Sequence, residues 1–216
     1  QDGADSQSRG KDRPQPTLPL RQRQEVQELL HAKPGLACAH QGKESRVSLL
    51  FSWLLNAVYL MAIVLALPWI VWSAIRYGKY CEGFAEKLLG RVPIRAGSRR
   101  CVWLHAVSVG EVNLLAKVIA ELATRRPDCE IIISTTTKTG FELARKKYAE
   151  HTVFYCPLDF TWATAAACRR IRPDLLVLAE LELWPNLIRA AKSQGARVAV
   201  INGRLSDSSY RGYGRF

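Results

Sequence analysis

The residue with the clearest potential for chemistry is Glu111, which ends a Ser-Val-Gly-Glu motif that begins at Ser108. The motif follows an apolar run at residues 101–107 and precedes apolar residues at helical spacing. This pattern predicts that the Glu111 carboxylate lies at the carboxyl end of a strand, where open α/β sheets build their binding crevice. A carboxylate at this place can serve as a general base. It can also serve only to complement the positive end of a helix.

Polar motifs follow four later apolar runs in the same way. In a parallel sheet all of them meet at one edge, and their carboxylates, hydroxyls and arginine suit a polyhydroxylated or phosphorylated ligand. Each motif also has a structural reading, because threonines cap helices, proline suits a first helical turn and asparagine shapes turns. The motifs are Thr135-Thr136-Thr137-Lys138-Thr139-Gly140, Pro157-Leu158-Asp159, Glu180-Leu181-Glu182-Leu183-Trp184-Pro185-Asn186 and Asn202-Gly203-Arg204-Leu205-Ser206.

The elements that must position these motifs alternate between strand and helix. Apolar runs such as residues 131–133 and 175–178 are continuous, which is typical of strands that helices cover on both faces. The sequence therefore predicts one α/β domain with a Rossmann-like parallel sheet over residues 101–216. Strands are expected at 101–107, 130–136, 152–156, 174–180 and 197–202, and helices near 111–125, 139–149, 161–171 and 184–194.

A membrane anchor is predicted at residues 47–76, because no charged residue occurs from Val47 to Ile75. This run exceeds the roughly 20 residues that cross a bilayer core, and four aromatic residues near its ends suit the membrane interface. The run is too long for a cleaved signal peptide. Asn56 and Pro68 interrupt it, so an anchor that lies within one leaflet is as consistent with the sequence as a spanning helix. The aromatic residues are Trp53, Tyr59, Trp69 and Trp72.

The net charge is +12, and the excess of basic residues is densest just after this anchor. Residues 77–100 are predicted to be a basic juxtamembrane linker, which the positive-inside rule places on the cytoplasmic side and which would attract anionic head groups. Nucleic-acid binding is disfavoured, because no recognition pattern accompanies the charge. Residues 1–46 are expected to be a disordered basic tail, with one short helix near 25–31. The basic residues of the flank are Arg76, Lys79, Lys87, Arg91 and Arg95.

Several other kinds of site are disfavoured by the sequence. The first strand-to-helix turn has one glycine where a dinucleotide fingerprint needs three, and no phosphate-binding P-loop occurs. The six cysteines form no C-x-x-C pair and are predicted to be reduced core thiols. The four histidines are equally dispersed, so no metal site built from neighbouring ligands is expected. His105 is expected to be a strand-end residue rather than a ligand, although it lies close enough to Glu111 to line the same cleft.

The anchor and the motifs, taken in order, resemble the N-terminal half of the 3-deoxy-D-manno-octulosonic acid (Kdo) transferases. The similarity covers roughly residues 50–216, and the combination of motifs is specific. The chain departs from the family pattern at three places. Gly203 stands between Asn202 and Arg204 where alanine is usual, Lys138 stands where a proline commonly follows the threonines, and Ala179 precedes the Glu-Leu-Glu.

The resemblance implies the N-terminal domain of a GT-B glycosyltransferase at the inner (cytoplasmic) membrane, with the catalytic domain facing the cytoplasm. This domain would bind a lipid A precursor, and a C-terminal domain absent from this chain would bind CMP-Kdo. Inverting transfer by direct displacement of CMP would need no metal or other cofactor. Glu111 matches the family's catalytic carboxylate and would be the general base. The substrate-binding residues are expected to be Ser108, Gly110, Thr135, Thr137, Lys138, Glu180, Glu182, Asn202 and Arg204.

Two other functions stay open at this point. One is a different membrane-associated GT-B transferase that acts on another lipid-linked sugar, and the other is a membrane-tethered binding module without chemistry. The chain begins at Gln1 rather than Met and stops at Phe216 after a Gly-Tyr-Gly run. We therefore expect a fragment that binds the acceptor but is inactive alone.

Overall fold

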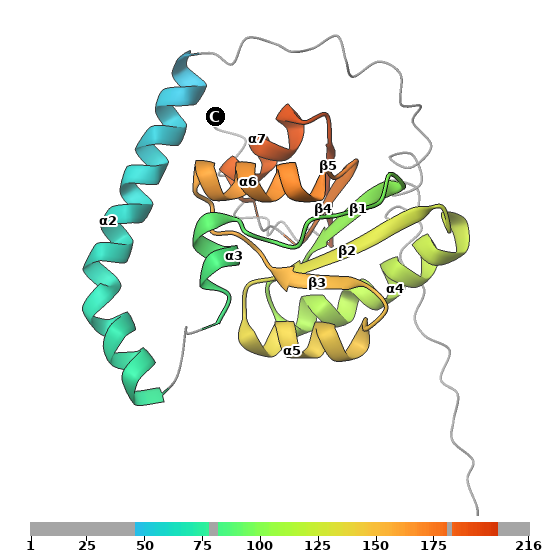
Figure 1. Ribbon diagram of the computed structural model, residues 1–216, viewed down its shortest axis with the longest axis horizontal. Helices are drawn as coiled ribbons and strands as arrows, with labels where there is room; N and C mark the ends of the chain where they lie inside the picture. Colours follow the sequence, from blue (N-terminus) through green and yellow to red (C-terminus); the bar gives the residue numbers. More distant parts are fainter. Residues whose placement is uncertain (1–45, 78–81, 181–182, 203–216) are drawn as a thin grey trace, which may run out of the picture.

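The computed structural model describes residues 46–77, 82–180 and 183–202. Its centre is a five-stranded parallel sheet in the order β3-β2-β1-β4-β5 (Figure 1). The Rossmann-like fold predicted from the sequence is confirmed, and every strand and helix of the domain ends within two residues of its expected position. The strands are β1 (Arg100–His105), β2 (Cys129–Thr135), β3 (Thr152–Tyr155), β4 (Leu175–Ala179) and β5 (Arg197–Ile201).

Helices cover both faces of the sheet, which explains why its strands are continuous runs of apolar residues. Helices α4 (Val109–Arg125) and α5 (Lys138–Lys147) lie on one face, and α6 (Thr161–Ile171) and α7 (Pro185–Ser193) lie on the other (Figure 1). Successive residues of β1 alternate between the two layers, since Val102 packs with the first pair of helices and Trp103 with the second. Two separate cores therefore hold the sheet rigid.

The described cysteines belong to these cores. Cys101, Cys129, Cys156 and Cys168 are all buried free thiols. Burial raises the pKa of the Cys101 and Cys168 thiols to about 12. These thiols are therefore protonated at neutral pH and act as small apolar side chains.

The order of the strands fixes where a ligand can bind. The chain builds β2 and β3 on one side of β1 and then returns to build β4 and β5 on the other side. The segment after β1 leads to α4 on one face, and the segment after β4 leads to α7 on the opposite face (Figure 1). The two segments diverge at the carboxyl edge, and this topological switch point is where open α/β sheets bind ligands.

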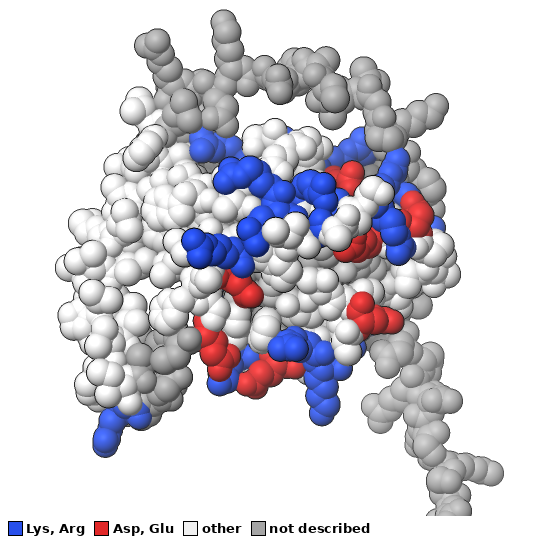
Figure 2. All heavy atoms as spheres, in the orientation of Figure 1, with Lys and Arg blue, Asp and Glu red and all other residues white. Residues whose placement is uncertain are grey.

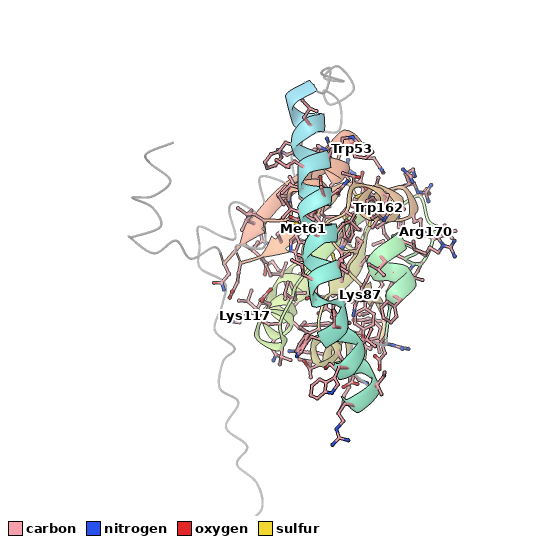
Figure 3. All side chains as sticks on the ribbon, turned by 90° about the vertical axis from the view of Figure 1, so that its left-hand side faces the viewer. Trp53, Met61, Lys87, Lys117, Trp162 and Arg170 are labelled. Carbon is pink, nitrogen blue, oxygen red and sulfur yellow. The ribbon has the colours of Figure 1, made fainter. Side chains whose placement is uncertain are left out.

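The predicted anchor is a single helix, α2 (Arg46–Tyr77), which continues through Pro68. Within it Leu50–Ser73 has a mean hydropathy of 2.3, and it is the one described helix long and apolar enough to cross a membrane. Only 6% of its most apolar 18-residue window is buried, whereas a core helix would be mostly buried. It runs along the outside of the domain, beside α3 and α6 (Figures 1 and 3).

One narrow face of α2 contacts the domain. The Asn56 side chain donates to the Thr161 hydroxyl at 2.8 Å and accepts from the Thr161 backbone N–H at 3.2 Å, at the first residue of α6. The Tyr59 ring lies edge-on to Phe160, with 6.0 Å between the ring centroids. Buried and half-buried positions recur along this face at alternate spacings of four and three residues, as in helix packing. They are Ser52, Asn56, Tyr59, Ile63, Ala66, Ile70 and Ser73.

The range expected to be a linker is partly folded onto the domain. Helix α3 (Phe84–Leu89) packs against α6 and β3. The ammonium group of Lys87 lies 4.1 Å from the centroid of the Tyr155 ring. Lys87 is half-buried, so α3 fastens the segment after α2 to the edge of the sheet.

Arg95 is buried, and the expectation that it faces lipid head groups is wrong. Its guanidinium donates to the backbone oxygens of Ile171 at 2.7 Å, Arg99 at 2.6 Å and Arg172 at 3.1 Å. The Ile171 and Arg172 carbonyls lie at and beyond the end of α6, where helices leave oxygens without partners, and the Arg99 carbonyl lies just before β1. Other basic residues do gather on the surface over α6 and the segment before β1 (Figure 2). They include Arg91, Arg99, Arg169 and Arg172, all of which are exposed.

Replacing Arg95 should therefore destabilise the domain. Arg95→Met leaves the three backbone oxygens without their donor, and we expect the free energy of unfolding to fall by roughly 2–3 kcal/mol. Arg91→Met is the matched control, because Arg91 is exposed, and its effect should stay within about 0.5 kcal/mol. Denaturant unfolding of the chain in one detergent measures both, and equal effects of the two substitutions would contradict the assignment.

Candidate functional site

Glu111 lies in the first turn of α4, and its side chain folds back onto the loop that precedes the helix. Its Oε2 accepts a hydrogen bond from the Val107 N–H at 2.8 Å. Its Oε1 accepts bonds from the Ser108 N–H at 3.3 Å and from the Ser108 hydroxyl at 2.7 Å. Ser108 caps α4 in return by accepting from the Glu111 N–H at 3.3 Å, which completes a capping box. The residue is only 6% exposed.

The threonine loop after β2 is tied to the same backbone. The hydroxyls of Thr135 and Thr137 donate to the Val107 carbonyl oxygen at 3.3 and 3.0 Å. Thr137 also caps α5 by accepting from the Gly140 N–H at 3.1 Å. A Cβ on Gly140 would lie 2.6 Å from the Thr135 hydroxyl oxygen, so this contact requires glycine. The first two motifs thus form one network around Val107.

Both readings of Glu111 fit this geometry. The capping role is present, because the carboxylate satisfies backbone donors at the start of α4. The described contacts give two hydrogen bonds to Oε1 and one to Oε2, so Oε2 keeps a lone pair for a further proton. A base fixed by two loops is held at one place relative to a bound acceptor, and position matters more than basicity for late proton transfer.

His105 ends β1 beside this network and is fully buried. Its Nδ1 lies 2.9 Å from the Ser134 hydroxyl oxygen, which also accepts from Trp103 Nε1 at 2.7 Å. Its Nε2 has no hydrogen-bond partner among the described residues. The ring stands edge-on to Trp184, with 6.1 Å between the centroids. Burial lowers the pKa of His105 to about 4, against a smaller opposing effect of the Ser134 backbone, so the ring is neutral at pH 7.

Asp159, in the segment between β3 and α6, positions the motif after β4. Its oxygens accept from the backbone N–H groups of Asn186 at 3.1 Å and Leu187 at 2.8 Å, in the first turn of α7. The Asn186 amide also donates to the Asp159 backbone oxygen at 2.6 Å, and the Tyr59 hydroxyl of α2 donates to its carboxylate at 3.4 Å. Burial raises the pKa of Asp159, and the two backbone donors oppose this effect.

This role of Asp159 was missed by the sequence analysis. The residue stands two positions before α6, where an aspartate is typical of a cap for that helix. It instead caps α7, which begins more than twenty residues later in the chain. The contacts of Asn56 and Tyr59 were missed as well, although polar residues three apart in an apolar run do indicate a contact face.

Glu180 and Asn202 come together at the ends of β4 and β5. The Asn202 side-chain amide donates to Glu180 Oε1 at 3.3 Å, and the Glu180 N–H donates to the Ile201 oxygen at 2.7 Å. Both residues have left-handed backbones, with φ of 59° at Glu180 and 55° at Asn202. This conformation is unfavourable for a glutamate, and such strain is concentrated at functional sites. Both side chains lie at the carboxyl edge of the sheet.

The remaining predicted residues fall into three groups. Gly110 lies in the exposed first turn of α4, where a Cβ would contact only the Ser108 hydroxyl oxygen at 3.7 Å. Lys138 is drawn away from the Glu111 network, because its ammonium pairs with Glu82 at 2.5 Å and lies 3.9 Å from Glu142. Glu182 and Arg204 lie outside the described residues, as does the short helix expected near 25–31.

No three His, Cys, Asp or Glu side chains gather as metal ligands anywhere in the described parts of the chain. The groups at the sheet edge are instead carboxylates, hydroxyls, amides and backbone N–H donors. Such groups recognise sugars and phosphates through hydrogen bonds.

Comparison with known proteins agrees with this chemistry. Residues 82–216 match the sequence model of the 3-deoxy-D-manno-octulosonic-acid transferase (Kdo transferase) family. The chain is 34% identical to the transferase of this name from Chlamydia pneumoniae over 165 residues, which is 75% of this chain and 38% of the relative. It is 32% identical to that from Bordetella pertussis over 151 residues, 66% of this chain and 35% of the relative. A bifunctional glycosyltransferase/methyltransferase of Fusobacterium nucleatum is 42% identical over 118 residues, 52% of this chain and 18% of the relative.

The buried imidazole predicts how the domain responds to acid. The folded state keeps His105 neutral down to about pH 4, whereas the unfolded chain protonates it near its ordinary pKa of 6.5. Stability contributed by the neutral ring is therefore complete above pH 6.5 and is lost as the pH falls to about 4, by roughly 3 kcal/mol. In urea unfolding at pH 7 and pH 4, the stability advantage of wild type over His105→Gln should shrink by this amount. An advantage that does not change with pH would contradict the assignment.

Proposed function

The chain belongs to the Kdo transferase family, and we propose that its full-length protein transfers Kdo from CMP-Kdo to a lipid A precursor in lipopolysaccharide biosynthesis. The observation that carries this proposal is the position of Glu111. Its carboxylate is fixed by Val107 and Ser108 at the carboxyl edge of β1, beside the switch point between β1 and β4. A general base at this crevice suits transfer to a sugar hydroxyl.

In the proposed reaction the acceptor hydroxyl attacks the anomeric carbon of Kdo from the face opposite to CMP. The new C–O bond forms while the bond from the anomeric carbon to the CMP phosphate oxygen breaks, and CMP leaves with the electron pair. The hydroxyl proton passes to Oε2 of Glu111, which accepts one described hydrogen bond where Oε1 accepts two. The reaction inverts the anomeric configuration and requires no metal or other cofactor.

The other edge residues are proposed to hold the acceptor. Glu180 and Asn202 already share a hydrogen bond and would orient sugar hydroxyls, with Glu182 and Arg204 beside them in the chain. Ser108, Thr135 and Thr137 would fix the loops around the base. Lys138 would contact an acceptor phosphate, provided that its ammonium leaves the exposed carboxylate of Glu82.

We further propose that the protein acts at the inner membrane with the domain facing the cytoplasm. The apolar surface of α2 and the basic surface that it borders in Figure 2 support this proposal. Apolar area suits the hydrocarbon, and arginines suit the anionic head groups of the cytoplasmic leaflet.

The donor site is proposed to lie in the part of the family that this chain does not cover, since the chain spans 38% of the length of the Chlamydia pneumoniae relative. The 216-residue chain alone would then bind acceptor without turnover.

The decisive test is Kdo transfer by the full-length protein with Glu111→Gln. We expect the substitution to lower kcat at least about 100-fold, because late proton transfer contributes roughly 10²–10⁴-fold. Acceptor binding should persist. Glu121→Gln is the matched control on the same helix, since Glu121 pairs with Arg125 at the surface at 2.6 Å, and it should leave kcat unchanged.

Other outcomes would separate the parts of the proposal. Full activity of Glu111→Gln would place the base elsewhere. Wild-type protein that is inactive on a lipid A precursor but active on another lipid-linked sugar would change the acceptor. Binding without any transfer would favour a tethered binding module.

Gly110 tests whether the acceptor approaches the start of α4. Gly110→Ala adds a methyl group that makes one ordinary contact, with the Ser108 hydroxyl oxygen at 3.7 Å, so the free energy of unfolding should hold or rise by up to about 1 kcal/mol, as for other glycines in helices. Acceptor binding should weaken at least tenfold in equilibrium titrations. Gly140→Ala is the contrasting variant, since its Cβ would clash with Thr135 and lower stability. Unchanged acceptor affinity in Gly110→Ala would exclude close approach there.

A further inference from the structure

A cavity of about 240 Å³ lies between the anchor helix and the domain. Its walls are almost entirely apolar side chains of α2, of the segment before α6 and of the start of α7. Asp159 contributes the one carboxylate, and both of its oxygens are turned to the backbone N–H groups of α7. A cavity of about 150 Å³ with such a lining already holds a benzene ring, so this one has room for a longer hydrocarbon segment. The lining residues are Tyr59, Ala62, Ile63, Leu158, Asp159, Phe160 and Trp184.

The way α2 packs on the domain determines whether the opening of this cavity faces lipid. The contact face runs from Ser52 to Ser73, over nearly the whole apolar segment Leu50–Ser73, so no long stretch of this segment extends beyond the domain. A bilayer crossing needs roughly 20 residues that face lipid. A helix docked in this way lies along the membrane surface with its outer face in the acyl chains. Met61 marks that outer face (Figure 3), where 60% of the residue is exposed.

The cavity also lies close to the carboxyl edge of the sheet. Trp184 lines it and also packs edge-on against His105, the last residue of β1. Two residues after His105, the Val107 N–H holds the Glu111 carboxylate. The Trp184 and His105 rings would therefore lie between a hydrocarbon tail in the cavity and a sugar at Glu111. Such neighbouring sites suit the acyl chain and the head group of one lipid.

We propose that this cavity binds one acyl chain of the glycolipid acceptor, drawn from the leaflet in which α2 lies. The proposal rests on the proposed function for the identity of the acceptor. The acyl chain enters past Ala62 and Ile63 and packs against Phe160 and Trp184. The bound chain positions the head group over the carboxyl edge of the sheet, so that lipid selection occurs partly through the tail.

Photocrosslinking tests this assignment without any measurement of transfer. The chain is reconstituted in phospholipid vesicles that contain a lipid A precursor with a diazirine in one acyl chain, and labelled residues are located by mass spectrometry. We expect labels within residues 158–163 and on Trp184. Ala62→Trp fills the cavity and should lower this labelling at least tenfold, and Ala62→Leu should lower it partly.

Met61→Trp is the matched control, because it places the same indole one residue away on the outer face, and it should leave the labelling unchanged. Vesicle flotation checks that each variant stays membrane-bound, and Ala62→Leu alone carries the test if Ala62→Trp is released. Labels confined to the outer face of α2, or labels insensitive to Ala62, would overturn the proposal. The proposal would also be overturned if a diazirine phospholipid labelled the cavity equally with and without excess unlabelled precursor. None of these results depends on Kdo transfer, so the cavity and the proposed function can fail separately.

Discussion

The Asp159 carboxylate connects the three parts of the molecule on which the site depends. It lies at the end of the segment after β3, it caps α7 through Asn186 and Leu187, and it accepts a bond from Tyr59 of α2. Backbone N–H donors at a helix start are what make a buried carboxylate tolerable, because they replace the water that burial removes. The position of the motif after β4 relative to α2 thus follows from one side chain.

Glu111 shows the same physics on the other side of the switch point. Each carboxylate sits at the carboxyl edge of the sheet and satisfies backbone donors at a helix start, Glu111 at α4 and Asp159 at α7. The difference lies in what remains free. Both Asp159 oxygens accept from α7 and one also accepts from Tyr59, whereas Glu111 Oε2 accepts from Val107 alone among the described contacts. The Asp159 carboxylate is therefore suited to holding α7 in place, and the Glu111 carboxylate is suited to accepting a proton.

The sequence predicted the fold well because local signals decide it. Continuous apolar runs and helical periodicity located every strand and helix of the domain, and the Ser108 to Glu111 spacing is itself the signature of a capping box. Contacts between distant segments have no such signal. The pairing of Asn56 with Thr161, 105 residues apart, and the burial of Arg95 against the end of α6 depend on how finished helices pack. Charge alone made Arg95 look like a membrane-facing residue, although its five donors suit buried carbonyl oxygens equally well.

In the proposed reaction, the docking of α2 on the domain would also set the distance between the membrane and Glu111. A tether of flexible chain would leave the height of Glu111 above the leaflet undefined, whereas Asn56 and Tyr59 fix α2 directly to the segment that leads into α6. That segment carries Asp159, which fixes α7 and with it Trp184 beside His105. Each link in this series is a hydrogen bond or a ring contact between folded elements. If α2 lies in the membrane as proposed, the fold sets the distance from the membrane surface to the carboxyl edge, and such a fixed distance suits the proposed lipid acceptor, whose sugar lies at a fixed depth.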